Sequence, residues 1–367
     1  MSPQGETRIF LPSSWLDRFA APQGRRDTPA LFIHSGWRSA GTWMWSEFRA
    51  RPETMAFYEP LNELLVGMTA ENMPLERPGG WDSGHPDTRP YFEEYAPLLA
   101  RRRGIRGYER SFAYDRYFMR EDEAHPKLAA YLHSLLALAE PTGKIPVLKF
   151  VRSLGRVGWM RRQFPAATHV TILRDPLAQW ASGSRFAQNQ NPYFLAAPLA
   201  IVAQSLKHPA VGAVVDALEL RLDSLRKGSF DTTYRACVDF VAQSSPKDLY
   251  RGSLAFWLPA TFCAIRHADL TIDSDRLAES STYRETIEHD LFARTGIAVD
   301  FSRVRATKPA DIPCGLSRDE LERIHGLAMQ AGSALAQANR TDAATAPAIE
   351  LLRQKLEDVR ARTTTAA

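Results

Sequence analysis

The segment of the chain best suited to chemistry is a turn of small residues, Gly-Trp-Arg-Ser-Ala-Gly-Thr, at positions 36–42. It follows a short apolar run and precedes a stretch whose apolar residues recur at helical spacing. In such a turn backbone N–H groups converge on an anion, and the N-terminus of the next helix adds roughly half a positive charge. The turn therefore predicts a phosphate-binding loop; the alternative is a strand-to-helix turn that binds nothing.

The loop differs from the form that binds ATP. That form has Gly, four residues, Gly, Lys and then Ser or Thr. This chain has Gly36, four residues, Gly41 and Thr42, with no Lys and with Arg38 inside the loop. Because the missing Lys would bridge the terminal phosphates of ATP, its absence favours a different phosphorylated donor.

The elements that would position this loop follow the order of a parallel α/β sheet. A strand, a glycine turn, a helix and a second strand form the repeating unit of such a sheet. We therefore expect an α/β fold with a P-loop-like, doubly wound parallel sheet of four to five strands flanked by helices. Short apolar runs predict strands at 30–35, 55–58, 147–151, 169–173 and 270–273, and helical spacing predicts helices at 42–51, 153–164, 283–295, 317–337 and 345–362.

One domain is expected to carry the sheet. Residues 29–340 are predicted as a single α/β domain, within which 195–262 form a helical insertion. Residues 1–28 mix Pro, Gly, Arg and Asp and predict an irregular lead-in, and residues 341–367 predict a C-terminal helix with a frayed tail.

The composition and net charge exclude several classes of protein. The chain has 367 residues, 44% of them hydrophobic and 24% charged, as in a globular protein rather than a disordered or collagen-like one. A net charge of +4 is too small to indicate a nucleic-acid binder, although it suits a compact polyanionic ligand.

No metal site is predicted, because Cys237, Cys263 and Cys314 lie far apart in no zinc-binding or disulfide pattern and are read as free thiols. The first residues lack the features of a signal peptide, and no apolar run is long enough for a membrane span. A cytoplasmic protein without a membrane span is expected.

The run WRSAGT resembles the 5′-phosphosulfate-binding loop of sulfotransferases that use 3′-phosphoadenosine-5′-phosphosulfate (PAPS). The usual form of that loop is Trp/Pro-Arg-Ser-Gly-Ser/Thr-Ser/Thr, so this chain departs from it at Ala40 and Gly41. The resemblance covers roughly residues 30–301. It implies that the donor is bound by Trp37, Arg38, Ser39, Ala40, Gly41, Thr42 and Trp43.

A second signature resembles the same family. Arg174, Asp175 and Pro176 follow the predicted strand at 169–173, and Ser182 lies further along the next helix. The resemblance implies that Arg174 and Ser182 bind the 3′-phosphate of the donor, and that Lys308, in a late loop, makes a further nucleotide contact. Since ligands of open α/β sheets bind at the carboxyl ends of the strands, the two loops can face one nucleotide. Asp175 with Pro176 predicts a helix start.

A third feature resembles the carbohydrate 6-O-sulfotransferases and the tyrosylprotein sulfotransferases most closely. Glu59, in FYEPL, matches the general base of those enzymes, and Lys149, in VLKFVR, matches the Lys that contacts the transferred sulfonate. The implied catalytic residues are Glu59, Lys149 and Arg38, acting by positioning and electrostatics in an in-line transfer. The alternative for Glu59 is a carboxylate before Pro60 that complements a helix dipole.

The resulting expectation is a sulfotransferase that moves the sulfuryl group of PAPS to a hydroxyl and releases 3′-phosphoadenosine 5′-phosphate (PAP), without a required metal. A glycan is the first acceptor and a peptide tyrosine the second, with no nucleic-acid partner. The alternatives are an ATP-dependent small-molecule kinase with a degenerate P-loop, a Mn²⁺ glycosyltransferase using Asp273 and Asp275, and a non-catalytic nucleotide-binding module. Residues 68–125 and 195–262 are expected to form the acceptor pocket, where aromatic residues either stack on a sugar or pack the core: Tyr108, Phe112, Tyr114, Tyr117 and Trp257.

Overall fold

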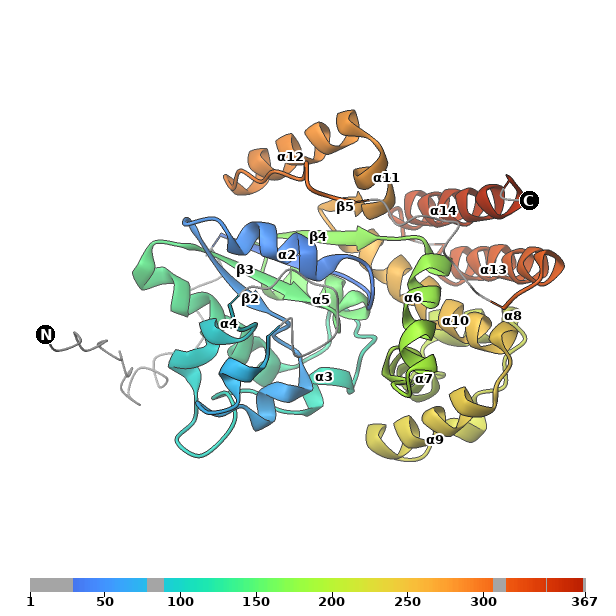
Figure 1. Ribbon diagram of the computed structural model, residues 1–367, viewed down its shortest axis with the longest axis horizontal. Coiled ribbons are helices and arrows are strands. Elements are labelled where there is room, and N and C mark those ends of the chain that lie inside the picture. Colours follow the sequence, from blue (N-terminus) through green and yellow to red (C-terminus); the bar gives the residue numbers. More distant parts are fainter. Residues whose placement is uncertain (1–28, 78–88, 306–314, 341, 366–367) are drawn as a thin grey trace, which may run out of the picture.

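Five parallel strands flanked by helices form the body of the protein in a computed structural model that describes residues 29–77, 89–305, 315–340 and 342–365 (Figure 1). The order across the sheet is β2-β3-β1-β4-β5. The strands are β1 (Ala30–His34), β2 (Thr54–Tyr58), β3 (Ile145–Phe150), β4 (Ala167–Leu173) and β5 (Leu270–Asp273). The α/β class and the five expected strands are confirmed, with ends that differ by a residue or two.

Strand β1 lies at the centre of the sheet, where it pairs with β3 on one side and β4 on the other. All five of its residues are buried, as expected of a parallel strand covered by helices on both faces. Because all the strands run in one direction, the loops that follow them meet at one edge of the sheet. Ligands bind at that edge in proteins of this architecture.

Most of the helices form two groups. The helices that connect the first four strands pack against the sheet, whereas the long helical stretch between β4 and β5 packs with α13 and α14 beside it (Figure 1). The helices are α2 (Gly41–Arg49), α3 (Ser111–Tyr114), α4 (Pro126–Ala139), α5 (Val157–Gln163), α6 (Pro176–Gln188), α7 (Tyr193–Gln204), α8 (Pro209–Ala217), α9 (Phe230–Gln243), α10 (Pro246–His267), α11 (Ser274–Glu279), α12 (Ser281–Thr295), α13 (Arg318–Ala338) and α14 (Thr345–Thr365).

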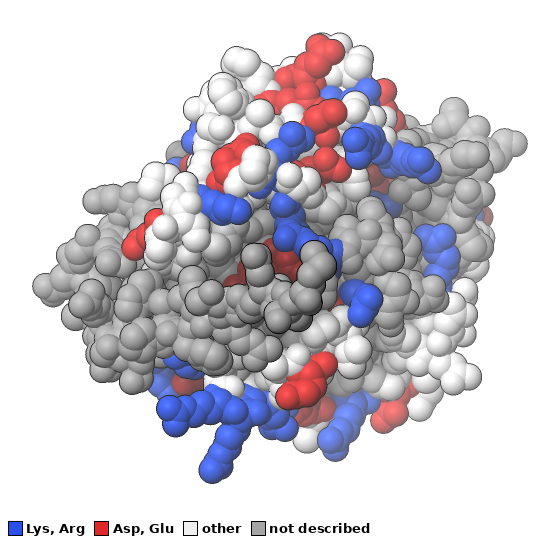
Figure 2. Space-filling model, turned by 60° about the vertical axis from the view of Figure 1, so that its left-hand side comes forward, with Lys and Arg blue, Asp and Glu red and all other residues white. Residues whose placement is uncertain are grey.

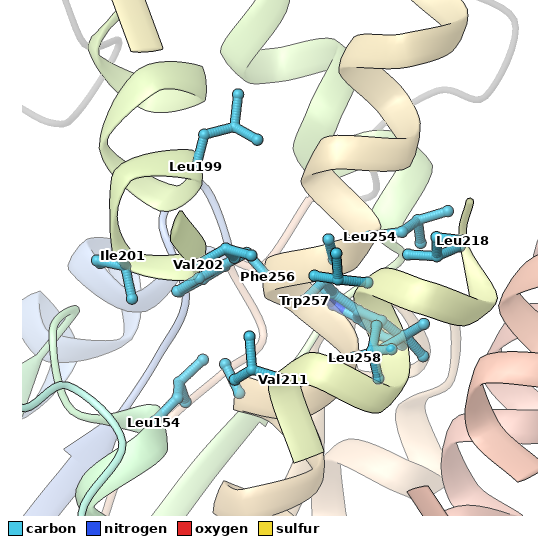
Figure 3. Packing of buried hydrophobic residues seen from close by; sticks show 14 of the residues in the cluster. Leu154, Leu199, Ile201, Val202, Val211, Leu218, Leu254, Phe256, Trp257 and Leu258 are labelled. Atoms are coloured by element: carbon cyan, nitrogen blue, oxygen red, sulfur yellow. The ribbon is translucent and has the colours of Figure 1, made fainter. Parts of the chain in front are cut away.

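The segment after β3 joins the helical stretch to the sheet. Leu154, in a short 3-10 helix of that segment, lies among side chains of α7, α8 and α10 (Figure 3). Val151 belongs to the same buried cluster, whereas Phe150, the last residue of β3, packs in the separate cluster around the sheet. The segment that carries Arg152 is therefore held between the two hydrophobic cores.

The length and polarity of the helices and the distribution of surface charge are relevant to binding of membranes and nucleic acids. Within the described parts of the chain, the helices are all too short or too polar to cross a lipid bilayer. Basic and acidic side chains are interspersed over the described surface of the face in Figure 2.

Gly41, the first residue of α2, is required by packing. A Cβ at this position would lie 2.5 Å from Oγ of Ser35 and 3.0 Å from Cε of Lys149. Ser35 is fully buried and its hydroxyl donates a hydrogen bond to the carbonyl oxygen of Phe150, so it has no room to retreat. The helix therefore begins closer to β1 and β3 than any other residue would permit.

Gly41→Ala is expected to lower the free energy of unfolding by about 1–3 kcal/mol, the usual cost of overpacking a filled site. Urea unfolding measures this change. Gly326→Ala is the matched control, because a Cβ there meets no atom within 4 Å and Gly326 is exposed in the middle of α13. That control should be neutral or up to about 1 kcal/mol more stable; an equally harmless Gly41→Ala would contradict the close packing.

Candidate active site

A cavity of about 570 Å³ opens at the carboxyl edge of the sheet. Its volume lies within the ~300–1,000 Å³ of small-molecule sites. The loops after β1, β2, β3 and β4 all contribute to its lining, together with the start of α7. Its charged lining residues are Arg38, Glu59, Glu63, Lys149, Arg152 and Arg174.

The turn after β1 forms one wall of the cavity, as residues 35–42 all line it. Arg38 and Ala40 have left-handed backbone conformations, with φ of 60° and 65°, and the hydroxyl of Ser39 donates a hydrogen bond to the carbonyl oxygen of Gly36 over 2.7 Å. Ala40 is the N-cap of α2, and no side chain caps the first amides of this helix. The N-terminus of α2 therefore presents uncapped N–H groups next to the cavity.

Ala40 and Gly41 differ in how well each suits its position. Ala40 has a left-handed conformation, which costs a residue with a Cβ about 1–2 kcal/mol. At Gly41, Ser35 and Lys149 fill the space that a side chain would need.

Arg38, Arg174 and Ser182 come together although they lie far apart in the sequence. Nε of Arg38 donates to Oγ of Ser182 over 2.9 Å, and Nη1 of Arg174 donates to the carbonyl oxygen of Arg38. The guanidinium of Arg38 also lies over the rings of Phe186 and Phe194, 4.7 and 5.2 Å from their centroids. The predicted loops after β1 and β4 thus meet at the cavity.

The charge of Arg38 is poorly compensated. Burial, followed by the nearby positive charges of Arg174 and Arg185, lowers the pKa of Arg38 to about 10. Within residues 29–77, 89–305, 315–340 and 342–365, no carboxylate forms an ion pair with Arg38. A bound anion would relieve both the burial and the repulsion, so these residues are suited to hold phosphate or sulfonate.

Glu59 lies between two buried cations. Nζ of Lys149 donates to Oε1 of Glu59 over 3.0 Å, and Nη1 of Arg152 donates to Oε2. Nζ of Lys149 also lies 3.3 Å from the hydroxyl oxygen of Thr42 at the start of α2. Glu59 itself has a left-handed φ of 42°, and Asn62 donates to its carboxylate over 3.3 Å. Lys149 therefore contacts both Glu59, the predicted base, and Thr42, the last residue of the glycine turn.

The pKa values of this cluster follow from burial and pairing. Burial alone would raise the pKa of Glu59, but Lys149 and Arg152 together lower it to about 2. Burial lowers the pKa of Lys149, and Glu59 offsets part of that effect. Glu59 is consequently ionised at neutral pH, yet it is a weak proton acceptor as long as both cations stay bound to it.

Arg152 is a site residue that the sequence reasoning missed. Its guanidinium bridges Glu59 and Glu63 and donates to the hydroxyl oxygen of Tyr193. The hydroxyl of Tyr114 donates to Glu63 over 2.8 Å, so one predicted aromatic residue joins this network. A basic residue close after Lys149 at the end of a buried strand was the available signal.

The remaining predicted site residues lie in the cavity lining, in the hydrophobic cores or outside the described residues. Trp37 lines the cavity, with its ring centroid 5.4 Å from that of Phe256. Trp43 does not line it and instead packs on Phe301, 5.5 Å away. Lys308 falls outside the described residues. All five aromatic residues expected in the acceptor pocket are buried in the two cores: Tyr108, Phe112, Tyr114, Tyr117 and Trp257.

Neither of the two segments expected to form the acceptor pocket contributes to the described lining of the cavity. Its described lining contains no residue of 68–125 or 195–262; Asn191, Tyr193 and Phe194, just before the insertion, take that place. Helix α7 begins at Tyr193, two residues before the predicted start of the insertion, and Tyr193 and Phe194 at its start line the cavity.

Asp273 and Asp275 make structural contacts. Asp273 caps α11, and both carboxylates pair with the buried ammonium of Lys355. In the described part of the chain, His, Cys, Asp and Glu side chains form no group of three or more that could hold a metal ion. Asp175 caps α6 ahead of Pro176, which confirms the predicted helix start.

Comparisons of the chain with protein-family models, with curated proteins and with solved structures found no match in any of the three.

Proposed function

We propose that the protein is a sulfotransferase that transfers the sulfuryl group of PAPS to a hydroxyl acceptor, with a glycan as the first candidate and a peptide tyrosine as the second. The observation that carries the proposal is that Arg38, Arg174, Lys149 and Glu59 line one cavity beside the glycine turn. Two arginines suited to phosphate and a Lys–Glu pair suited to group transfer are then within reach of one ligand.

The residues present fit such a donor. The turn 36–42 would act as a P-loop-like cradle, in which the amides of residues 39–42 and the guanidinium of Arg38 hold the 5′-phosphosulfate. Arg174 and Ser182 would hold the 3′-phosphate, since both contact Arg38 and Arg174 lines the same cavity. Bound PAPS supplies an activated sulfuryl group; the chain supplies orientation, positive charge and a proton acceptor.

Lys149 links the donor loop to the base. Its ammonium lies between Oε1 of Glu59, at 3.0 Å, and the hydroxyl oxygen of Thr42, at 3.3 Å. An anion in the loop would draw Lys149 toward itself and weaken its pairing with Glu59. The pKa of Glu59 would then rise from its low value, and Glu59 would become a better acceptor for the hydroxyl proton.

The contacts of the Thr42 hydroxyl argue against the kinase alternative. An ATP-dependent P-loop enzyme places Mg²⁺ on the hydroxyl that begins the helix, here that of Thr42. That hydroxyl lies 3.1 Å from the hydroxyl of Tyr58 and 3.3 Å from Nζ of Lys149, so neither of these described partners is an acidic group that could share Mg²⁺ with it. The pairing of Asp273 and Asp275 with Lys355 weighs similarly against the Mn²⁺ glycosyltransferase.

PAP is expected to raise the melting temperature by a few degrees without metal. A ligand at 100 times its Kd stabilises the native state by about 2.7 kcal/mol. The thermal-shift series compares PAP, AMP, ATP with Mg²⁺ and a UDP-sugar with Mn²⁺, and a ³⁵S transfer assay with glycans and tyrosine peptides follows, with and without EDTA. Stabilisation by ATP or a UDP-sugar but not by PAP would refute the proposal, as would transfer abolished by EDTA.

A further inference from the structure

The guanidinium of Arg152 is shared between two carboxylates of the cavity lining. Its Nη1 donates to Oε2 of Glu59, whereas its Nη2 pairs with Oε2 of Glu63. The side chain of Arg152 is 4% exposed, that of Glu59 9% and that of Glu63 25%. Glu59 therefore receives one arm of the guanidinium and not the two-armed contact that makes an arginine–carboxylate pair strong.

Two tyrosine hydroxyls hold the second arm of Arg152 at Glu63. The hydroxyl of Tyr114, in α3, donates to Oε1 of Glu63 over 2.8 Å, and the hydroxyl of Tyr193, at the start of α7, lies 3.2 Å from the same oxygen. Nη2 of Arg152 also donates to the hydroxyl oxygen of Tyr193. Burial would lower the pKa of Arg152, but the charge of Glu63 is the largest of the effects that raise it well above its usual value, so Arg152 is a cation.

The other polar neighbours of Glu59 lie on β2, on β3 and in the loop after β2. Lys149 donates to its Oε1 over 3.0 Å, and Asn62 donates to its Oε2 over 3.3 Å. Burial and then the charge of Glu59 raise the pKa of Tyr58 well above its usual value, so Tyr58 is neutral. An anionic donor would draw Lys149 away from Glu59, and the remaining cation that limits the basicity of Glu59 is then Arg152.

We propose that Glu63 is a positioning residue for the general base, which holds one arm of Arg152 and so keeps the guanidinium from pairing with Glu59 through both arms. This inference rests on the proposed function. In that reaction the proton of the acceptor hydroxyl moves to Glu59, the hydroxyl oxygen bonds to sulfur, and the bond between sulfur and PAP breaks. A two-armed pair would occupy more of the acceptor sites of Glu59 and lower its affinity for that proton.

Glu63→Gln should lower kcat about tenfold, within the range of a general base, and change the KM for PAPS by less than about twofold. Gln keeps an oxygen for the hydroxyls of Tyr114 and Tyr193 but loses the charge that holds Arg152, so the freed arm turns to Glu59. Steady-state kinetics with saturating acceptor measures both constants. Glu63→Ala, which buries no new polar group, tests the same loss if Glu63→Gln does not fold.

The double variant Arg152→Met/Glu63→Gln is the decisive measurement in turnover. It removes one positive and one negative charge and leaves Lys149 and Asn62 on Glu59, so kcat at neutral pH should return to within about threefold of the parent. A purely structural role of Glu63 predicts no such rescue, because the second substitution would then only add damage. Either a double variant as slow as Glu63→Gln or a Glu63→Gln protein with kcat within about twofold of the parent would overturn the inference.

Carboxyl-carbon NMR of protein labelled with ¹³C in its glutamate side chains reads the state of Glu59 without turnover, and Glu59→Gln assigns the signal. The pKa of Glu59 is about 2 in the parent, so its signal should stay that of a carboxylate down to about pH 4, the usual range of a glutamate. Glu63→Gln should behave in the same way. In the double variant the signal should titrate above about pH 4, because one of its two cations is gone; a signal that still does not titrate there would overturn the inference.

Asp231→Asn is the matched control. Asp231, on α9, pairs through both carboxylate oxygens with Arg110, the N-cap of the helix that carries Tyr114, over 2.6 and 2.7 Å. Its loss loosens the same wall of the network but removes no partner of Arg152, so kcat should stay within about threefold of the parent. A control that slows as much as Glu63→Gln would overturn the inference.

The parent protein separates this inference from the proposed function. A parent that transfers no sulfuryl group from PAPS to any hydroxyl would overturn the proposed function, and the role of Glu63 with it. A parent that does transfer, and whose kcat is insensitive to Glu63→Gln, would overturn the role of Glu63 alone.

Discussion

Glu59→Gln is expected to lower the turnover of sulfuryl transfer by about 100-fold or more, the usual contribution of a general base. The Kd for PAP should rise by less than about threefold, because Glu59 contacts Lys149 and Arg152 rather than the arginines proposed to bind phosphate. Steady-state kinetics with saturating donor, beside PAP titration calorimetry, measures both quantities. The pattern of lost kcat with retained donor affinity identifies a group that acts in the transition state.

The same substitution removes a buried anion, so stability must be measured beside activity. Breaking a buried ion pair from one side costs about 3 kcal/mol or more. Glu94→Gln is the control, because Glu94 pairs over 2.7 Å with the buried Arg49 and neither residue belongs to the described lining of the cavity. It should lose comparable stability and keep its turnover per folded molecule. A Glu59→Gln enzyme turning over within about threefold of the parent would exclude Glu59 as the base.

Arg174→Ala is expected to weaken PAP binding by about 10- to 100-fold, which corresponds to the ~1.5–3 kcal/mol of a hydrogen bond to a charged group. Binding of adenosine 5′-phosphosulfate, which lacks the 3′-phosphate, should change by less than about threefold. Competition of each nucleotide against a fluorescent PAP analogue gives the two affinities under one set of conditions.

Arg185→Ala controls for the loss of a positive charge near the cavity. Arg185 is exposed on α6 and acts on Arg38 through its charge at longer range. Since salt screens exposed charges, its removal should change PAP affinity by less than about threefold. An equal loss of both nucleotides in Arg174→Ala would mean that the 3′-phosphate binds elsewhere.

The parts of the fold that could be predicted from the sequence are those with a local cause. Each strand is a short apolar run, and Pro176 starts α6 because its missing N–H has no partner in a first turn. Helix α4 (Pro126–Ala139) went unpredicted because it is buried on most of its circumference, so its sequence lacks a clear polar face. The glycine turn was identified because small residues follow a predicted strand, and Arg174 because Arg-Asp-Pro after a strand resembles a known family signature.

The remaining site residues depend on contacts that no local pattern encodes. Arg152 takes its role from Glu63 and Tyr193, which other segments bring to it. Lys355 pairs with Asp273 across 82 residues of sequence, and no local pattern in α14 marks it as the partner of that carboxylate. Trp43 was included because it follows the loop, yet a helix turns successive residues by about 100°, and this rotation carries its ring to Phe301 instead.

The left-handed backbone at three cavity positions has a consequence for attempts to make this protein more heat-resistant. Arg38, Ala40 and Glu59 have φ of 60°, 65° and 42° without being glycine, at a cost of about 1–2 kcal/mol each. A library screened for melting temperature alone would be enriched in Gly or Asn at Arg38 and Ala40, because both residues tolerate that conformation. At Glu59 the loss of its two buried ion pairs would cost more than the relieved strain. At Arg38 the stabilised clones would have discarded a side chain proposed for donor binding, so thermal selection has to be paired with a screen for turnover.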